Sequence, residues 1–426
     1  MRNFKNKCLR EDKLLFKGLN IANNEGWLDD FSENNFLIRA MNNEIDYFRK
    51  YSNLIENSPY YAANYCNTFL INFSSRISSL IALFGKKEVK KFFNTGLSAG
   101  KNNYKDEQFF RAFSEAIIID FLAKYGPSKL KEGIYEPKLG PNGSNPEARL
   151  IFECGTIVDV EVKTPGFTLK EEEEMLIPTF LLNSEDDKVF KDVSDKYNVK
   201  YIKPRALKLK DFINSAGKKF VMPENSKHVN LLYINWTYSD MKHAGFKEPY
   251  GLLYNNLNGI LKNRKAALEL GIEEEALKKI TAIIVYQDTF ESIIFNDFRD
   301  IWNGYKFRLL PNKIMDQRLV DNDILFEITK MRPPIKGDEL FPYLGCWKRN
   351  LEEAFEVSNV INTHIKKKIS KLKNKNFNDN FVYFTKEFYL ESIREQYNFY
   401  NEWKDYLIPQ NKVEDYLKRA DGFLIL

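Results

Sequence analysis

The sequence predicts a mixed α/β protein in which a central sheet is flanked by helices, with further helical regions at both ends of the chain. Short runs rich in Val, Ile, Leu and Tyr, which are typical of strands, lie in the middle of the chain and have helical patterns between them. Before about residue 100 and after about residue 335, apolar residues recur at helical spacing instead. We therefore expect a helical region over 1–100, an α/β domain over 101–335 and a helical region over 336–426.

The N-terminal region is predicted to be helical because two of its stretches repeat apolar residues every three to four positions. FLIRAMNNEIDYFRKYSNLI and the longer YYAANYCNTFLINFSSRISSLIALF are expected to pair as a helical hairpin, with Pro59 at the start of the second helix. The polar stretch NTGLSAGKNNYKDE then breaks the pattern. A further helix, QFFRAFSEAIIIDFLAKYG, is expected to end at Gly126, just before Pro127.

Four strands are predicted next, at 148–154, 156–163, 228–236 and 279–288. Helices over ALKLKDFINSAGKKF and PYGLLYNNLNGILKNRKAALEL separate the later strands. We interpret the acidic, weakly periodic segment near 167–203 as an insertion that covers the domain. In the C-terminal region, a lysine cluster at 366–375 is followed by aromatic residues. The lysines could contact phosphates and the aromatic residues could stack on bases. Alternatively, the lysines form an ordinary charged helix face and the aromatic residues belong to the core.

The composition excludes several classes of protein. The chain has 426 residues, of which 43% are hydrophobic and 29% charged, as in ordinary folded proteins. With a net charge of only +5, any binding to nucleic acid must come from local basic patches. Four widely spaced cysteines and three histidines argue against a zinc site or a disulfide framework. Without a leader or a long uninterrupted apolar run, we expect a cytoplasmic protein that does not interact with membranes.

The stretch PEARLIFECGTIVDVEVKTPG, residues 146–166, carries charged side chains on one face of two strands. Alternate residues of a strand face opposite sides of a sheet. The even positions of the second strand are Val158, Val160 and Val162, which suit a core. The odd positions include Asp159, Glu161 and Lys163, and the preceding strand adds Glu147 at an odd position.

A hairpin that turns at Gly155 would place Glu147 opposite Lys163 and Arg149 opposite Glu161, with Glu147 diagonally next to Glu161. Acids gathered this closely repel one another and need a cation to remain ionised away from water. Oxygen ligands suit Mg²⁺, with Mn²⁺ as a substitute, better than zinc. A metal that deprotonates water, beside a lysine that stabilises developing charge, hydrolyses phosphodiester bonds. The alternative is a solvated strand face with a weak surface ion pair.

The order PE at 146–147, a hairpin, and EVK at 161–163 resembles the PD-(D/E)xK nuclease superfamily, which includes many restriction endonucleases and repair nucleases. The resemblance covers roughly residues 105–290 and implies a restriction endonuclease-like core. In that core Glu161 and Lys163 would be the ExK pair, and Glu147 would hold the position of the motif's aspartate. The resemblance also implies that Glu115, on the preceding helix, faces the metal. Because the family usually has Asp where this chain has Glu147, Asp159 is the alternative ligand.

We therefore predict an Mg²⁺-dependent nuclease that acts on DNA. We expect it to be an endonuclease of the restriction or antiphage-defence type. Its metal ligands would be Glu147, Glu161, Asp159 and Glu115, and its catalytic lysine would be Lys163. The alternatives are the same site acting on RNA or branched DNA, and a non-catalytic nucleic-acid-binding protein that keeps the nuclease fold. A homodimer is a further expectation, because cutting both strands of a duplex requires two sites or two successive nicks. Lys218 and Lys219 are weaker candidates for phosphate contacts.

Overall fold

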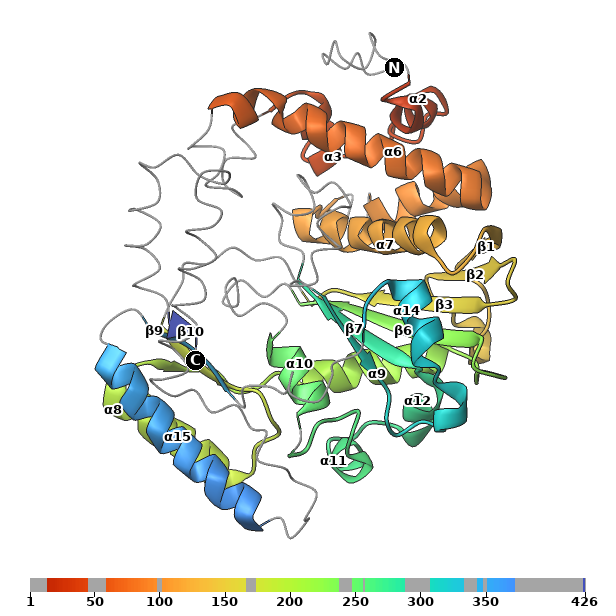
Figure 1. The fold of residues 1–426 in the computed structure, drawn as a ribbon. Helices are drawn as coiled ribbons and strands as arrows, with labels where there is room; N and C mark the ends of the chain where they lie inside the picture. The colour runs from red at the N-terminus through yellow and green to blue at the C-terminus, as the bar shows by residue number, and fades with distance from the viewer. Residues whose placement is uncertain are drawn as a thin grey trace, which may run out of the picture. The chain divides into compact units, whose positions relative to one another are not determined.

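The computed structural model of the chain (Figure 1) describes residues 14–44, 59–97, 102–165, 174–236, 247–255, 257–287, 307–332, 343–347, 351–371 and 424–425. The chain divides into two compact units. Unit 1 comprises residues 1–170, 210–242 and 272–333, and unit 2 comprises residues 171–209, 243–271 and 334–426. This division differs from the three expected parts, because the N-terminal helices share a unit with the main sheet. The expected insertion belongs to unit 2, together with the C-terminal residues.

A six-stranded mixed sheet forms the centre of unit 1, with the order β1-β2-β3-β6-β7-β8. Neighbouring strands are antiparallel from β1 to β3, parallel from β3 to β7, and antiparallel between β7 and β8. The strands are β1 (Leu130–Tyr135), β2 (Ala148–Phe152), β3 (Ile157–Lys163), β6 (His228–Asn235), β7 (Ala282–Tyr286) and β8 (Phe307–Pro311). The mixed α/β class and the four predicted strands are confirmed, whereas β1 and β8 were not predicted.

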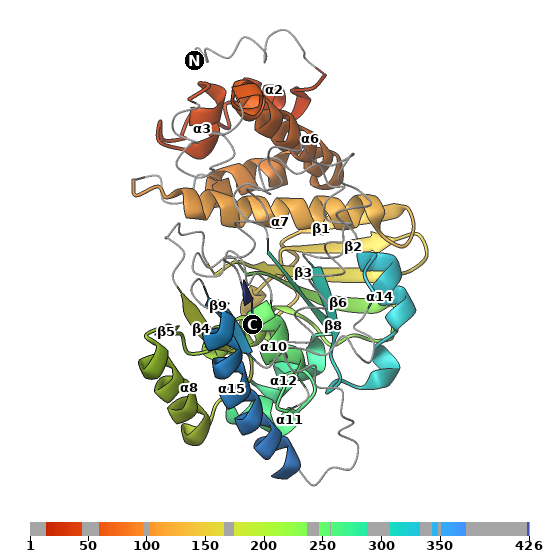
Figure 2. The same cartoon turned by 60° about the vertical axis from the view of Figure 1, so that its left-hand side comes forward.

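Helices of unit 1 lie on both sides of this sheet, with α7 on one side and α9 on the other (Figure 1). The valines of β3 and the apolar residues of β2 share one core with α6 and α7. In the view of Figure 2, α7 again runs along the sheet. The helices are α2 (Lys17–Asn24), α3 (Phe36–Met41), α6 (Pro59–Phe92), a π-helical turn (Phe93–Leu97), α7 (Asp106–Tyr125), α9 (Ala206–Lys219), α12 (Glu274–Lys279) and α14 (Asn322–Thr329). The predicted start at Pro59 and the end at Gly126 are confirmed.

Helix α6 and the π-helical turn after it contain the one segment of the described residues, Asn67–Leu97, that is long and apolar enough to cross a membrane. Length and composition are the only grounds for this, and the core helix of a soluble protein passes the same test. Phe69, Phe73 and Ile77 of α6 are fully buried in the core of unit 1. Packing in that core accounts for the apolar character of these positions.

Unit 2 is built on a four-stranded sheet with the order β10-β9-β4-β5. Its strands are β4 (Met175–Pro178), β5 (Lys200–Tyr201), β9 (Tyr343–Trp347) and β10 (Leu424–Ile425). Its helices are α8 (Ser184–Tyr197), α10 (Lys247–Tyr254), α11 (Arg264–Glu269) and α15 (Leu351–Lys371), and the apolar faces of α8 and α15 share a core. The expected helical C-terminal region, 336–426, contains α15 and also the strands β9 and β10, whose backbones pair with each other. The C-terminal aromatic residues at 381–389 lie outside the described residues.

Candidate active site

The hairpin β2–β3 confirms the predicted alternation of its side chains. Val158 and Val160 are fully buried, Val162 is 3% exposed, and all three belong to the core shared with α7. On the opposite face, the side chains of Asp159 and Glu161 are also fully buried. The burial of both carboxylates rules out the alternative of a solvated strand face with a weak surface ion pair.

The register of this hairpin differs by two residues from the predicted one. Arg149 lies opposite Asp159, not opposite Glu161. The cause is the loop, in which the Phe152 amide donates to the carbonyl oxygen of Thr156 at 2.9 Å. Residues 153–155 therefore form a three-residue loop between Phe152 and Thr156. The third residue of this loop is Gly155, with a φ of +83°. Three-residue hairpin loops place a left-handed residue at this position, and glycine adopts that conformation without strain.

Asp159 is held by a network that links three neighbouring strands. Arg149 of β2 donates to both of its oxygens at 2.7 Å, and Nε2 of His228 on β6 lies 3.0 Å from Oδ2. Although burial raises the pKa of Asp159, the hydrogen bonds from Arg149 and His228 lower it below its usual range. Both oxygens are therefore engaged, and the structure does not bring Asp159 together with the other predicted ligands.

A second cluster on the same face contains Glu161, Lys163, Lys219 and Glu147. Nζ of Lys163 lies 2.5 Å from Oε1 of Glu161. Nζ of Lys219, at the end of α9, lies 2.7 Å from the same oxygen and 3.5 Å from Oε1 of Glu147. The other oxygen of Glu161, Oε2, is buried without a hydrogen-bond partner. Two ammonium groups therefore share Oε1 of Glu161, whereas Oε2 of the same carboxylate has no hydrogen-bond partner.

The electrostatics of this cluster show a shortage of positive charge around its acids. Burial and the charge of Glu161 raise the pKa of Glu147 to about 7, and Lys219 and Lys163 only partly oppose this effect. Although burial lowers the pKa of Lys219, the charges of Glu161 and Glu147 raise it overall. An additional cation would therefore stabilise the ionised form of Glu147.

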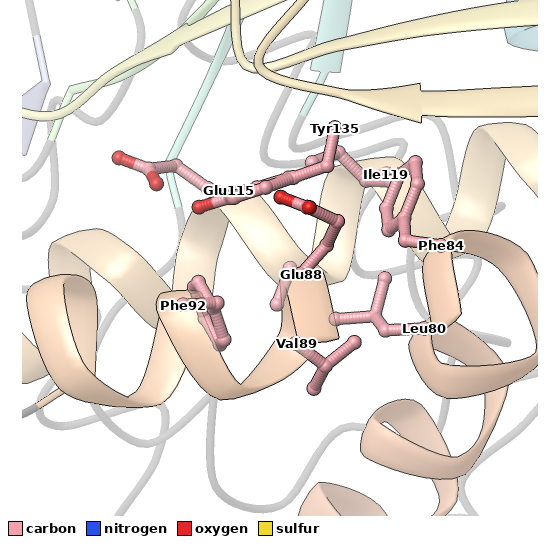
Figure 3. Close-up of a pocket in the computed structure, with 9 residues that line it drawn as sticks. Leu80, Phe84, Glu88, Val89, Phe92, Glu115, Ile119 and Tyr135 are labelled. Carbon is pink, nitrogen blue, oxygen red and sulfur yellow. The ribbon is translucent and has the colours of Figure 1, made fainter. Parts of the chain in front are cut away.

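Glu115 lies on α7, close enough to this cluster for the charges of Glu147 and Glu161 to act on it. Its carboxylate points away from Leu80 and Phe84 in Figure 3. Burial raises the pKa of Glu115 well above its usual range, and the nearby charges of Glu147 and Glu161 raise it further. Glu115 is thus electrostatically part of the acidic group.

The pocket drawn in Figure 3 lies between α6, α7 and β1 and is lined mostly by apolar side chains. Its volume is about 10 Å³, which is the space of about one water molecule. It is therefore too small to admit a nucleotide or any other organic ligand.

The acids of this cluster offer oxygen donors to a metal ion, although they do not converge on a common point. Among the described residues, no group of three His, Cys, Asp or Glu side chains converges closely enough to hold a metal ion. The donors themselves are suitable, since the unpartnered oxygen of Glu161 is buried and Glu147 lacks counter-charge. Carboxylate oxygens are the ligands that Mg²⁺ and Mn²⁺ prefer. The donor chemistry thus fits a divalent cation, with Lys219 occupying part of the space between the acids.

The sequence pattern predicted neither the pairing of Lys219 with the two acids nor that of His228 with Asp159. The two lysines at the end of α9 have different roles, because Lys218 is 62% exposed and pairs with Glu273 at 3.0 Å. The only sequence signal for Lys219 was its place on the helix after the EVK stretch. For His228, the signal was its position at the start of an apolar strand.

Unit 2 has its own pocket, of about 720 Å³, where the N-terminus of α8 and residues of α11 meet α15. Lys203 and Lys368 contribute to its lining, but both pair with acids. Asp186 receives hydrogen bonds from Lys368 and lies 2.8 Å from Nε2 of His364. Burial raises the pKa of Asp186, but hydrogen bonds from the backbone amide of Asn183 and from the side chains of Lys368 and His364 lower it overall. This paired cluster stabilises the contact between α8 and α15.

The resemblance to the PD-(D/E)xK nucleases rests on the sequence motif of this hairpin, residues 146–163. No family model, curated protein or solved structure matches the chain.

Proposed function

We propose that the protein is a metal-dependent nuclease that hydrolyses the phosphodiester bonds of DNA. In this proposal it is an endonuclease of the restriction or antiphage-defence type. The observation that carries the proposal is the environment of Glu161. This buried residue shares one oxygen between Lys163 and Lys219, leaves the other without a partner, and lies beside the under-neutralised Glu147. Perturbed carboxyl groups next to lysines are typical of catalytic sites.

The order of the elements supports the proposal. Helix α7 carries an acid, the hairpin β2–β3 leads into the EVK stretch, α9 follows, and β6 then pairs with β3 in parallel. This is the order that the resemblance to the PD-(D/E)xK superfamily implies. A restriction endonuclease-like core is therefore part of the proposal.

The residues of the cluster have distinct roles in the proposed reaction. Glu161 and Glu147 would hold a divalent cation, with Glu115 as a third acid, and the bound cation would supply a water of lowered pKa and polarise the phosphate. Lys163 is 21% exposed, so its ammonium group can reach both Glu161 and a bound substrate. There it would orient the attacking water and stabilise the negative charge that develops on the phosphate oxygens.

The first experiment tests activity and substrate class together. Purified protein is incubated with supercoiled plasmid, linear duplex, single-stranded DNA and RNA, each with Mg²⁺, with Mn²⁺ and with EDTA. We expect nicking or linearisation of the plasmid that requires the metal. Cleavage of RNA alone would shift the proposal to that substrate, and binding of nucleic acid without any cleavage would favour a non-catalytic binding protein.

A pair of lysine variants tests the site itself. Lys163→Ala should reduce cleavage by roughly 10²- to 10³-fold, as expected for the loss of one transition-state donor, while binding of nucleic acid is nearly retained. The control is Lys129→Ala, since Lys129 is 81% exposed and pairs with Glu153 at the surface. A Lys163→Ala variant that cuts at the wild-type rate would end the catalytic hypothesis.

A further inference from the structure

Lys219 reaches the candidate site from a different element than the acids and Lys163. It is the last residue of α9, and its Nζ lies between Oε1 of Glu161 at 2.7 Å and Oε1 of Glu147 at 3.5 Å. Its side chain is 24% exposed, so part of it remains accessible to a substrate. A lysine in this position contacts both acids and solvent.

The end of α9 is anchored on several sides, which fixes the origin of the Lys219 side chain. The hydroxyl of Ser144 donates to the carbonyl oxygen of Lys218 at 2.9 Å. Nζ of Lys279 donates to the carbonyl oxygen of Gly217 at 3.1 Å. These two bonds satisfy carbonyl groups that the end of a helix leaves without partners. Supporting contacts of this kind hold functional side chains in place.

Close packing at the same turn adds to this anchoring. A Cβ atom at Gly217 would lie 2.3 Å from the Cβ of Ala276, so α9 and α12 touch there through glycine. Phe220, the next residue after Lys219, is fully buried. The backbone that carries Lys219 is therefore held in place, whereas its four-carbon side chain can turn.

The charges of the site suggest what Lys219 contributes. Three carboxylates, Glu115, Glu147 and Glu161, face two ammonium groups, Lys163 and Lys219, so the fully ionised cluster has a net charge of −1. One divalent cation would change this to +1, which attracts a phosphodiester anion. Without Lys219 the same loaded site would be neutral. A divalent cation between the acids would also repel Lys219 from them.

We propose that Lys219 is a second substrate-binding lysine of this site. It offsets part of the negative charge of Glu161 and Glu147 before the metal and the substrate bind, and it contacts a non-bridging phosphate oxygen of the nucleic acid afterwards. This inference rests on the proposed nuclease function. It assigns to the end of α9 a contact with the phosphodiester backbone that Lys163 alone does not provide.

The test compares Lys219→Gln and Lys219→Arg with the neighbouring control Lys218→Gln. Rates are measured on the nucleic acid that the wild-type protein cleaves, and Mn²⁺ binding is measured by calorimetry without substrate. Lys219→Gln should lower kcat/KM by roughly 10²-fold, and Lys219→Arg should recover most of this loss because Arg also donates to phosphate. Lys219→Gln should bind Mn²⁺ at least about fivefold more tightly, because a competing positive charge has been removed.

Each outcome bears on the inference in a defined way. Wild-type kcat and KM in Lys219→Gln, or an equal loss in Lys218→Gln, would overturn it while leaving the nuclease proposal intact. Weaker Mn²⁺ binding by Lys219→Gln would also overturn it, since Lys219 would then merely support the acids. If the wild-type protein neither cleaves nucleic acid nor binds Mn²⁺, both proposals fail. Thermal melting of each variant, with Lys219→Arg as the conservative case, shows whether the fold is retained.

Discussion

Replacing Arg149 by Met should destabilise unit 1 by removing the main partner of a buried carboxylate. Asp159 is fully buried and Arg149 is 18% exposed, and the two form two bonds of 2.7 Å each. Exposed pairs contribute at most about 1 kcal/mol, whereas breaking a fully buried pair costs about 3–5 kcal/mol. Because Arg149 is partly exposed and His228 remains beside Asp159, we expect a loss of about 2–4 kcal/mol.

Hydrogen exchange is the appropriate assay, because a chain of two units need not unfold in a single step. The amides of β2 and β3 should exchange roughly 30- to 700-fold faster in Arg149→Met, since every 1.4 kcal/mol is a factor of ten. The control is Arg111→Met, because Arg111 is 44% exposed and pairs with Glu107 at the surface. For this control we expect a change of less than about 1 kcal/mol.

The pH dependence of the same variant provides a second measurement. The folded-state pKa of Asp159 is lowered, so its contribution is complete above the unfolded value of about 4. That contribution is lost as the pH falls through the lower folded-state pKa. The difference in stability between wild type and Arg149→Met should therefore shrink in acid. A difference that is below about 0.5 kcal/mol at neutral pH, or that grows in acid, would refute the assigned network.

Three further predictions concern other parts of the fold. Gly217→Val should destabilise unit 1 by about 1–3 kcal/mol in urea unfolding, because its Cβ would meet Ala276 at 2.3 Å. Glu248→Gln removes the buried negative charge that pairs with Arg205, so hydrogen exchange should accelerate in unit 2 by the equivalent of about 3 kcal/mol and stay unchanged in unit 1. Asp186 has a lowered pKa, so unit 2 should lose stability in melting experiments as the pH falls below about 4, and Asp186→Asn should weaken this dependence.

The main elements of unit 1 were predictable because their patterns are local. The period-two alternation of β3 and the helical spacing of α7 each reflect burial on one face, and both were confirmed. Both missed strands, β1 and β8, lie at the edges of the sheet. No residue of β1 is buried, so its sequence lacks the apolar alternation typical of a strand, and β8 is only five residues long. The helix predicted over 249–270 is in fact two helices, α10 and α11, and Asn263 caps the second by accepting from the amide of Ala266.

The composition of the site depends on a hairpin register that the apolar pattern does not determine. A shift of two residues keeps every side chain on the same face, so both registers bury the valines equally well. The loop distinguishes them, since Gly155 takes the left-handed third position and Cys154 becomes the centre of the turn. In the observed register Arg149 binds Asp159, so the proposed ligand role falls to other acids.

The same shift explains why a lysine from α9 belongs to the cluster. Arg149 lies opposite Asp159 and binds it, whereas the predicted register placed Arg149 opposite Glu161. Glu161 and Glu147 are then left with Lys163 as the one cation that the hairpin itself provides, and Lys219 supplies the second from α9. Substituting Glu147 therefore tests the proposed metal site more directly than substituting Asp159, whose loss is expected to act through stability.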